Sequence, residues 1–154
     1  MKRLLTSSLL ACCLIAPIAQ ASNCQVHFTI LDGNVQRALT IGSKLPQWQA
    51  REQMCERLNS FGGAINVAGG FSTGAGTVSY FVHLTVGERV TGFSIPDHGI
   101  NFVMSGRFPD AKTESELIDI AIPAFRGTTK KLLQNWYESG GFEKAVEAFL
   151  NSRN

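Results

Sequence analysis

The sequence predicts an α+β domain: an antiparallel sheet of about four to five strands, one helix after the first strand, and two to three C-terminal helices packed on the sheet. Three observations predict this class. Segments with alternating apolar residues occur at the start and in the middle of the chain, and segments with helical spacing close it. No internal repeat or linker divides the sequence, so we expect one domain over residues 22–154.

The first twenty-one residues have the features of a secretory signal peptide. Lys2 and Arg3 supply positive charge, residues 4–18 supply a short apolar stretch, and Ala21 closes a group of small residues suited to cleavage. We therefore expect cleavage after Ala21 and a periplasmic or secreted protein. Cys12 follows a lipobox-like sequence, but acylation there would leave an exposed hydrophobic tail, so lipidation is only the alternative.

Charge and hydropathy exclude two classes of partner. Without the leader, the chain has 133 residues with twelve basic and twelve acidic side chains, so its net charge is zero. Nucleic-acid binders usually carry a clustered basic excess, and we expect no nucleic-acid partner. No later segment approaches the ~20 apolar residues of a membrane-spanning helix, so the mature form is expected not to span a membrane.

The first strand and the first helix are expected to be joined by a disulfide bond. Residues 24–31 alternate as in a half-buried strand, and residues 45–61 have helical apolar spacing that ends at a glycine pair. Cys24 and Cys55 are the cysteines that remain after cleavage, in an oxidising compartment. Their bond would close a loop of about 30 residues and contribute roughly 3 to 4 kcal/mol.

An antiparallel meander is expected in the middle of the chain. Residues 62–76 contain six glycines, which predicts tight turns around a short strand at 64–68. Residues 77–86 form the clearest alternating strand. Residues 89–95 are its expected partner, and residues 100–105 are a further strand.

Helices are expected at the C-terminal end. Thr113 and Glu116 have the spacing of a capping box, and Pro123 is expected to end the short helix that follows. A second helix is expected to end at the glycine pair 140–141. A third places its apolar side chains on one face over residues 142–150.

Catalytic and metal-binding motifs are not found. The chain contains three histidines, His27, His83 and His98, and no GxSxG, HExxH or paired CxxC motif. His27 and His83 fall on the less apolar faces of strands, and His98 falls in a turn. We expect no metal, no cofactor and no catalytic residue, although a small envelope hydrolase with a histidine-based site is the alternative.

The glycine-rich stretch 69–76 invites comparison with a phosphate-binding loop. Ala75 occupies the position at which a P-loop has its lysine, so a hairpin turn or mobile loop is the favoured interpretation. Phe71, between glycines, would then be presented to a partner as part of a contact loop.

Three basic residues are a candidate anion site. Arg126, Lys130 and Lys131 lie at the expected start of the second C-terminal helix, where helix N–H groups and cations together suit an anionic ligand. An ordinary solvated surface is the favoured alternative.

Phe81 and His83 lie opposite the apolar face of the clearest strand. Either the terminal helices cover this second face or it is a contact surface. Coverage is the favoured interpretation, because amphipathic helices must bury their apolar faces.

These observations favour an exported small binding protein, such as an inhibitor, immunity or accessory factor, that acts on a protein or an envelope component. The histidine-based hydrolase is one alternative. A small-ligand-binding protein, with a pocket between the sheet and the terminal helices, is the other.

Overall fold

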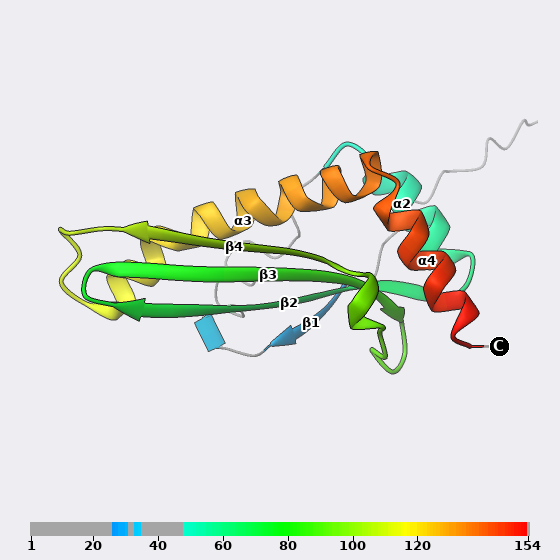
Figure 1. Ribbon diagram of the computed structural model, residues 1–154, viewed down its shortest axis with the longest axis horizontal. Helices are drawn as coiled ribbons and strands as arrows, with labels where there is room; N and C mark the ends of the chain where they lie inside the picture. The colour runs from blue at the N-terminus through cyan, green and yellow to red at the C-terminus, as the bar shows by residue number, and fades with distance from the viewer. Residues whose placement is uncertain (1–25, 31–32, 35–47, 154) are drawn as a thin grey trace, which may run out of the picture.

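The computed structural model describes residues 26–30, 33–34 and 48–153, and within them the chain has an α+β structure (Figure 1). A long, narrow sheet carries helices along one side. The elements in chain order are β1 (Val26–Ile30), α2 (Arg51–Asn59), β2 (Gly63–Gly74), β3 (Thr77–Glu88), the short 3-10 helix η1 (Pro96–His98), β4 (Ile100–Arg107), α3 (Glu114–Glu138) and α4 (Gly141–Asn151).

The sheet has the strand order β1-β2-β3-β4, and its pairing corrects the expectation of an all-antiparallel sheet. β2, β3 and β4 are antiparallel neighbours, whereas β1 runs parallel to β2. The connection between β1 and β2 contains α2, and a connection of that length returns the chain in the same direction, as parallel pairing needs. The antiparallel part therefore has three strands among the described residues, fewer than the expected four to five.

The glycine-rich segment is a strand, which corrects the expected turns and loop. β2 pairs with β3 along its whole length, and the chain reverses at Ala75 and Gly76, both with positive φ. Its central glycines admit aromatic rings close to the backbone. A Cβ on Gly69 would lie 3.1 Å from the Phe125 ring, and one on Gly70 would lie 2.6 Å from the Phe81 ring.

Residues 89–95 form a turn, so the strand expected there is wrong. A single bridge joins Gly87 to Ser94. The turn closes tightly because Gly92 has a φ of +70° and its carbonyl accepts a hydrogen bond of 2.8 Å from the buried Asn66 side chain.

The capping box at the start of α3 is confirmed. Thr113 Oγ1 accepts from the Glu116 N–H, and Glu116 Oε2 accepts from the Thr113 N–H, each at 3.2 Å. The expected helix end at Pro123 is wrong, because this residue lies inside α3. Proline removes one helical N–H, but the buried stripe continues on both sides of it, from Ile118 to Phe125, and holds the helix together.

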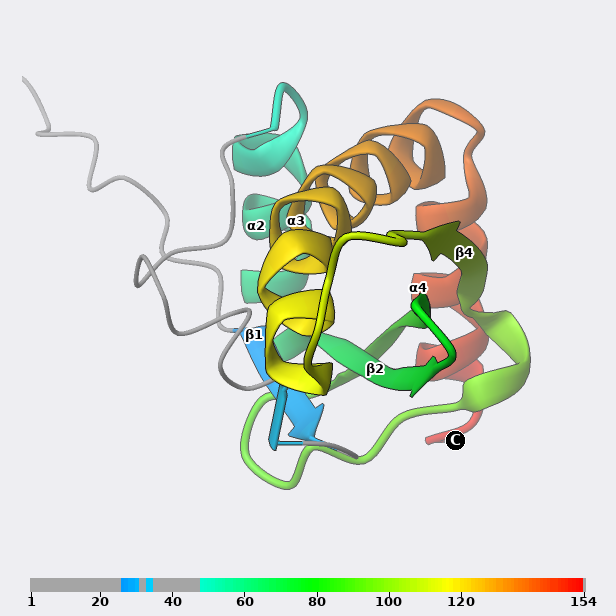
Figure 2. The same ribbon diagram turned by 90° about the vertical axis from the view of Figure 1, so that its left-hand side faces the viewer.

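The helices form a layer on one side of the curved sheet (Figure 2). α3 runs along the sheet, and α4 crosses one end of it. The core between the layers includes aromatic rings from β2, β3, α3 and α4, with Trp136 and Phe142 in edge contact at 5.6 Å. Within the described part of the chain, every helix is too short or too polar to cross a membrane.

α2 packs over this core at the end that carries α4. The helix expected over residues 45–61 is described from residue 48, and it begins at Arg51. Gln134 of α3 accepts backbone hydrogen bonds from Gln49 and Ala50, which replaces a side-chain cap at the start of α2. Met54, Cys55 and Leu58 are its buried residues.

Candidate functional site

The candidate site is the side of the sheet that faces away from the helices. On β3, every second residue from Val78 to Val86 is buried in the core beneath the helices, and the residues between them point the other way. We call the second side the outer face. Its central residues, from β2, β3 and β4, are Ser72, Ser79, Phe81, His83, Asn101, Val103 and Ser105.

An aromatic and an aliphatic side chain lie next to each other at the centre of the outer face. Phe81 on β3 is directly opposite Val103 on β4, and they are 37% and 71% exposed. The Phe81 ring lies over Gly70 of β2, where the missing side chain leaves room for it. The two residues therefore form one apolar spot across neighbouring strands.

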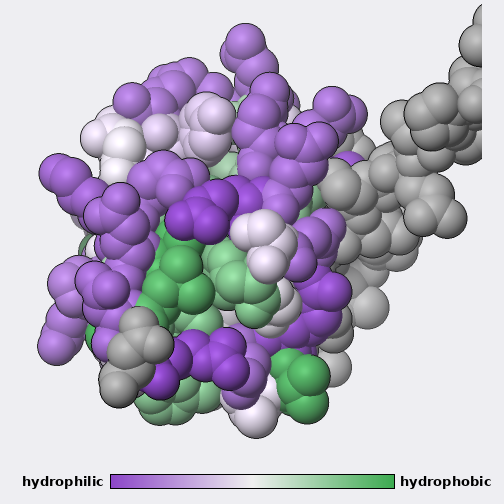
Figure 3. Space-filling model, turned by 90° about the vertical axis from the view of Figure 1, so that its right-hand side faces the viewer, coloured by the Kyte–Doolittle hydropathy of each residue, from purple (hydrophilic) through white to green (hydrophobic). Residues whose placement is uncertain are grey.

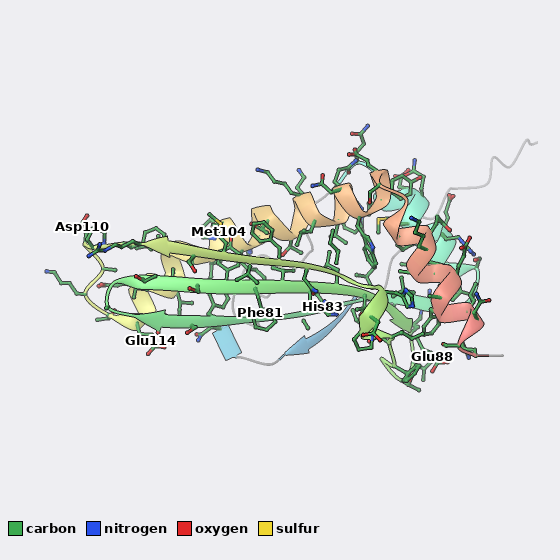
Figure 4. All side chains as sticks on the ribbon, viewed as in Figure 1. Phe81, His83, Glu88, Met104, Asp110 and Glu114 are labelled. Atoms are coloured by element: carbon green, nitrogen blue, oxygen red, sulfur yellow. The ribbon has the colours of Figure 1, made fainter. Side chains whose placement is uncertain are left out.

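Polar but uncharged pairs flank this spot. On one side the hydroxyls of Ser79 and Ser105 are 2.6 Å apart, and on the other side His83 Nδ1 is hydrogen-bonded to Asn101 Oδ1. Figure 4 labels Phe81 and His83 along β3, with Met104 beside α3. Among the residues of β2, β3 and β4 on this face, the formally charged one is Arg107, at the end of β4.

The expectation that helices cover Phe81 is wrong. The helices bury their apolar stripes against the opposite side of the sheet, where Val82 and Leu84 are fully buried together with Phe125 and Leu133. One face of the sheet is sufficient to bury them, so Phe81 is left in contact with solvent.

Phe71 is not part of a contact loop, which corrects the expectation that it is presented to a partner. It lies on β2 and faces the helices, with its ring centroid 5.9 Å from that of Tyr80 and 5.2 Å from that of Phe125. The period of two along the strand places Phe71 and Gly69 on the core side.

The three basic residues do not lie at the start of a helix. Arg126, Lys130 and Lys131 are in the interior of α3, because Pro123 does not interrupt it. Backbone N–H groups there are used within the helix, so the proposed combination of cations with free helix N–H groups does not form.

No protein family model, curated protein or solved structure matches this chain. The site must therefore be interpreted from its own geometry.

The described histidines do not form a metal-binding arrangement. His83 contacts Asn101, and His98 is exposed in η1. His27 belongs to β1, and the structure does not describe the side chains of that strand. Within residues 26–30, 33–34 and 48–153, no group of three or more His, Cys, Asp or Glu residues could hold a metal ion.

A cavity lies at the opposite end of the sheet from α4, where β4 leads into α3. Its volume is about 550 Å³. Phe108 and Ile120 supply apolar surface to it. Its charged lining residues are two basic and three acidic ones: Arg107, Lys112, Asp110, Glu116 and Asp119. Figure 4 marks this end of the molecule by Asp110 and Glu114. The volume is within the range of small-molecule pockets, ~300–1,000 Å³.

Several apolar residues are exposed although the sequence pattern did not predict it. Val103 and Met104 follow Phe102 directly. A run of apolar residues ordinarily predicts a strand that is buried on both faces, so this pattern does not predict their exposure. Val90 and Phe93, 89% and 59% exposed, were assigned to a strand but lie in the turn after β3. Figure 3 shows the α4 end of the molecule, where hydrophobic surface is framed by hydrophilic side chains.

Proposed function

We propose that this chain is an exported binding protein whose partner is another protein, and that the partner binds the outer face. The observation that carries the proposal is the exposed pair of Phe81 and Val103, directly opposite each other in an uncharged setting. An inhibitor, immunity or accessory factor acts through such a surface.

The composition of the outer face supports a protein partner. The centres of protein interfaces are depleted of charge and enriched in aromatic residues, and polar groups surround them. Phe81 supplies the aromatic centre, and the serines at 72, 79 and 105 supply small polar neighbours. A nucleic acid or an anionic lipid surface would need clustered cations, and this face carries Arg107 only at its end.

Export is proposed from the leader and from the position of the cysteines. Cys55 is fully buried on α2, and Cys24 lies two residues before Val26, the first described residue of β1. β1 pairs with β2, and α2 packs against β2, so a bond between Cys24 and Cys55 joins two elements that contact the same strand. Cys24 lies outside the described residues, and the disulfide remains a proposal.

Site-specific photo-crosslinking in the native host tests the binding surface. A benzophenone amino acid replaces Ser72, which is exposed on the outer face, or Lys130, which is exposed on α3. We expect one envelope protein to crosslink from position 72 and not from position 130. Crosslinking from position 130 alone would contradict the outer face as the site.

Substitution then measures the contribution of the aromatic ring. Phe81→Thr removes the ring and keeps a strand-forming residue, so affinity for the crosslinked protein should fall at least about tenfold, or 1.4 kcal/mol. Phe93→Thr is the matched control, because Phe93 is also exposed but lies in the turn after β3. Equal effects of the two substitutions would contradict the proposal.

A second candidate function is the binding of a small ligand, and the cavity beside the start of α3 is the observation that favours it. Charged side chains of both signs line it together with apolar Phe108 and Ile120, a combination that suits a small amphipathic molecule. Native mass spectrometry of protein taken from its host should then show a retained mass that is lost from Ile120→Glu and kept by Phe81→Thr.

A further inference from the structure

A second surface is the edge of β4, with which no other described strand pairs. β4 is the last strand of the sheet, and its side chains are mostly exposed. Its sequence from Ile100 to Gly106 contains no charged residue and no proline. Proteins usually protect such an edge with lysine, proline or a bulge, because an unpaired apolar edge pairs readily with another strand.

The hydrogen-bond pattern identifies the residues that present their backbone to this edge. The N–H of Phe108 donates to the carbonyl of Gly76 at 2.7 Å, next to the paired residues Thr77 and Arg107. Bonded and non-bonded pairs alternate along an antiparallel ladder, so the even-numbered residues of β4 bond to β3. The N–H and C=O groups of three odd-numbered residues therefore point to the open edge: Asn101, Val103 and Ser105.

We propose that this edge pairs with the same edge of a second copy of the chain, with the two-fold axis at Val103. In this register Val103 lies opposite Val103, and Phe102 lies opposite Met104 on the core side of the sheet. Asn101 then lies opposite Ser105 on the outer face. The three residues that face the edge exchange backbone hydrogen bonds with the same three residues of the other copy.

The register is self-complementary, which is why we infer a second copy and not a strand of another protein. From residue 101 to residue 105, apolar residues oppose apolar residues, and polar residues oppose polar ones. Shifting the axis to Met104 would place Phe102 opposite Gly106 and Val103 opposite Ser105. One contact between the two Met104 side chains would then replace the two kinds of apolar contact. Phe102 and Met104, 37% and 45% exposed in the single chain, become partly covered in the pair.

Charge also permits the pairing. Arg107 would lie opposite Gly99 at each end of the paired strands, so the two arginines lie at opposite ends and no like charges face each other. The net charge of the exported chain is zero. The proposed dimer joins two sheets into one and places two outer faces side by side. Its contact uses the edge of β4 and does not depend on the proposed partner.

The mass of the purified protein in solution tests this proposal. We expect the wild type to reach twice the chain mass as its concentration rises in analytical ultracentrifugation. Val103→Pro removes an N–H that points to the open edge and leaves the bonds to β3 intact, so it should raise the dimer dissociation constant at least about tenfold while the chain stays folded. Val103→Thr keeps the N–H and a branched side chain, and it should remain dimeric.

Paired cysteines test the register even if the proline variant fails to fold. Residues 102 and 104 form a non-bonded pair with a Cα separation of about 4.5 Å, within reach of a disulfide. A mixture of Phe102→Cys and Met104→Cys chains should give a mixed disulfide dimer on oxidation, and either variant alone should give little. Equal crosslinking in all three samples would overturn the register.

A wild type that stays monomeric at every concentration would overturn the proposal and leave the edge to an extended segment of another protein. A Val103→Pro variant that folds and keeps the dimer mass would also overturn it, because the interface would then lie elsewhere. Val103 also belongs to the outer face, so partner binding is tested separately, by Phe81→Thr and by the crosslink at position 72.

Discussion

At the scale of single residues, the most informative positions are two neighbouring glycines on β2. Gly69 faces the core and lies under Phe125, and Gly70 faces outward and lies under Phe81. The glycines therefore allow one ring to approach each face of the sheet at the same point along the strand. Glycine costs strand stability through its backbone freedom, and the ring contacts offset that cost.

Gly69→Ala tests this role. The new Cβ would lie 2.9 Å from the Phe81 carbonyl oxygen and 3.1 Å from the Phe125 ring, so the free energy of unfolding should fall by about 1–3 kcal/mol. Gly74→Ala is the control in the same strand, because nothing lies within 4 Å of its Cβ, and its effect should stay within about 0.5 kcal/mol. Urea denaturation of both variants measures the difference. Equal stabilities would mean that the strand adjusts and the close approach is not needed.

At the scale of elements, α3 shows how packing overrides a local signal. Pro123 is a helix breaker, yet the helix continues for fifteen residues beyond it, to Glu138. Isolated helices obtain their stability from local bonds, but this one buries Ile122 and Phe125 on either side of the proline. The capping box at Thr113 is confirmed. It could be predicted from the sequence because its partners lie only three residues apart and need no tertiary contact.

Pro123→Ala restores the missing backbone N–H in an exposed position of α3. The free energy of unfolding should therefore rise by about 1–3 kcal/mol. Gly127→Ala is a comparison at another exposed position of α3, with nothing within 4 Å of its Cβ, and should add about 0.5–1 kcal/mol. Thermal and chemical denaturation check both. If Pro123→Ala were destabilising while Gly127→Ala behaved as expected, the local bend at the proline would be required for packing.

At the scale of the whole molecule, two ion pairs among the described residues link elements that are far apart in the chain. Arg57 of α2 and Glu143 of α4 form an ion pair of 3.1 Å, and Arg153 pairs with Glu88 at 3.0 Å. Both pairs are partly exposed and contribute little to stability. A disulfide between β1 and α2 would constrain the unfolded chain far more strongly.

Reduction of the proposed disulfide bond should lower the free energy of unfolding by about 3 kcal/mol, because a loop of about 30 residues is then free in the unfolded state. Denaturation with and without reductant measures the difference. Thiol titration of the denatured, unreduced protein should detect no free thiol. Two free thiols would disprove the bond between Cys24 and Cys55. An equal free energy of unfolding with and without reductant would mean that the bond does not stabilise the fold.

The sequence by itself determined the features that depend on neighbouring residues. The alternation along β3, the capping box at Thr113 and the amphipathic α4 follow from spacing, and with them the α+β class. The placement of Phe81 and His83 on the second face of their strand follows from the same period. What covers that face does not, because coverage depends on where distant helices pack.

The tertiary structure alone decided the parallel pairing of β1, the conversion of a glycine-rich segment into a long strand, and the passage of α3 through Pro123. It also decided that the helices share one side of the sheet and leave Phe81 and the edge at Val103 exposed. Each of these outcomes depends on contacts between residues far apart in the chain. Local propensity cannot specify them, since their free energy arises only when the core is assembled.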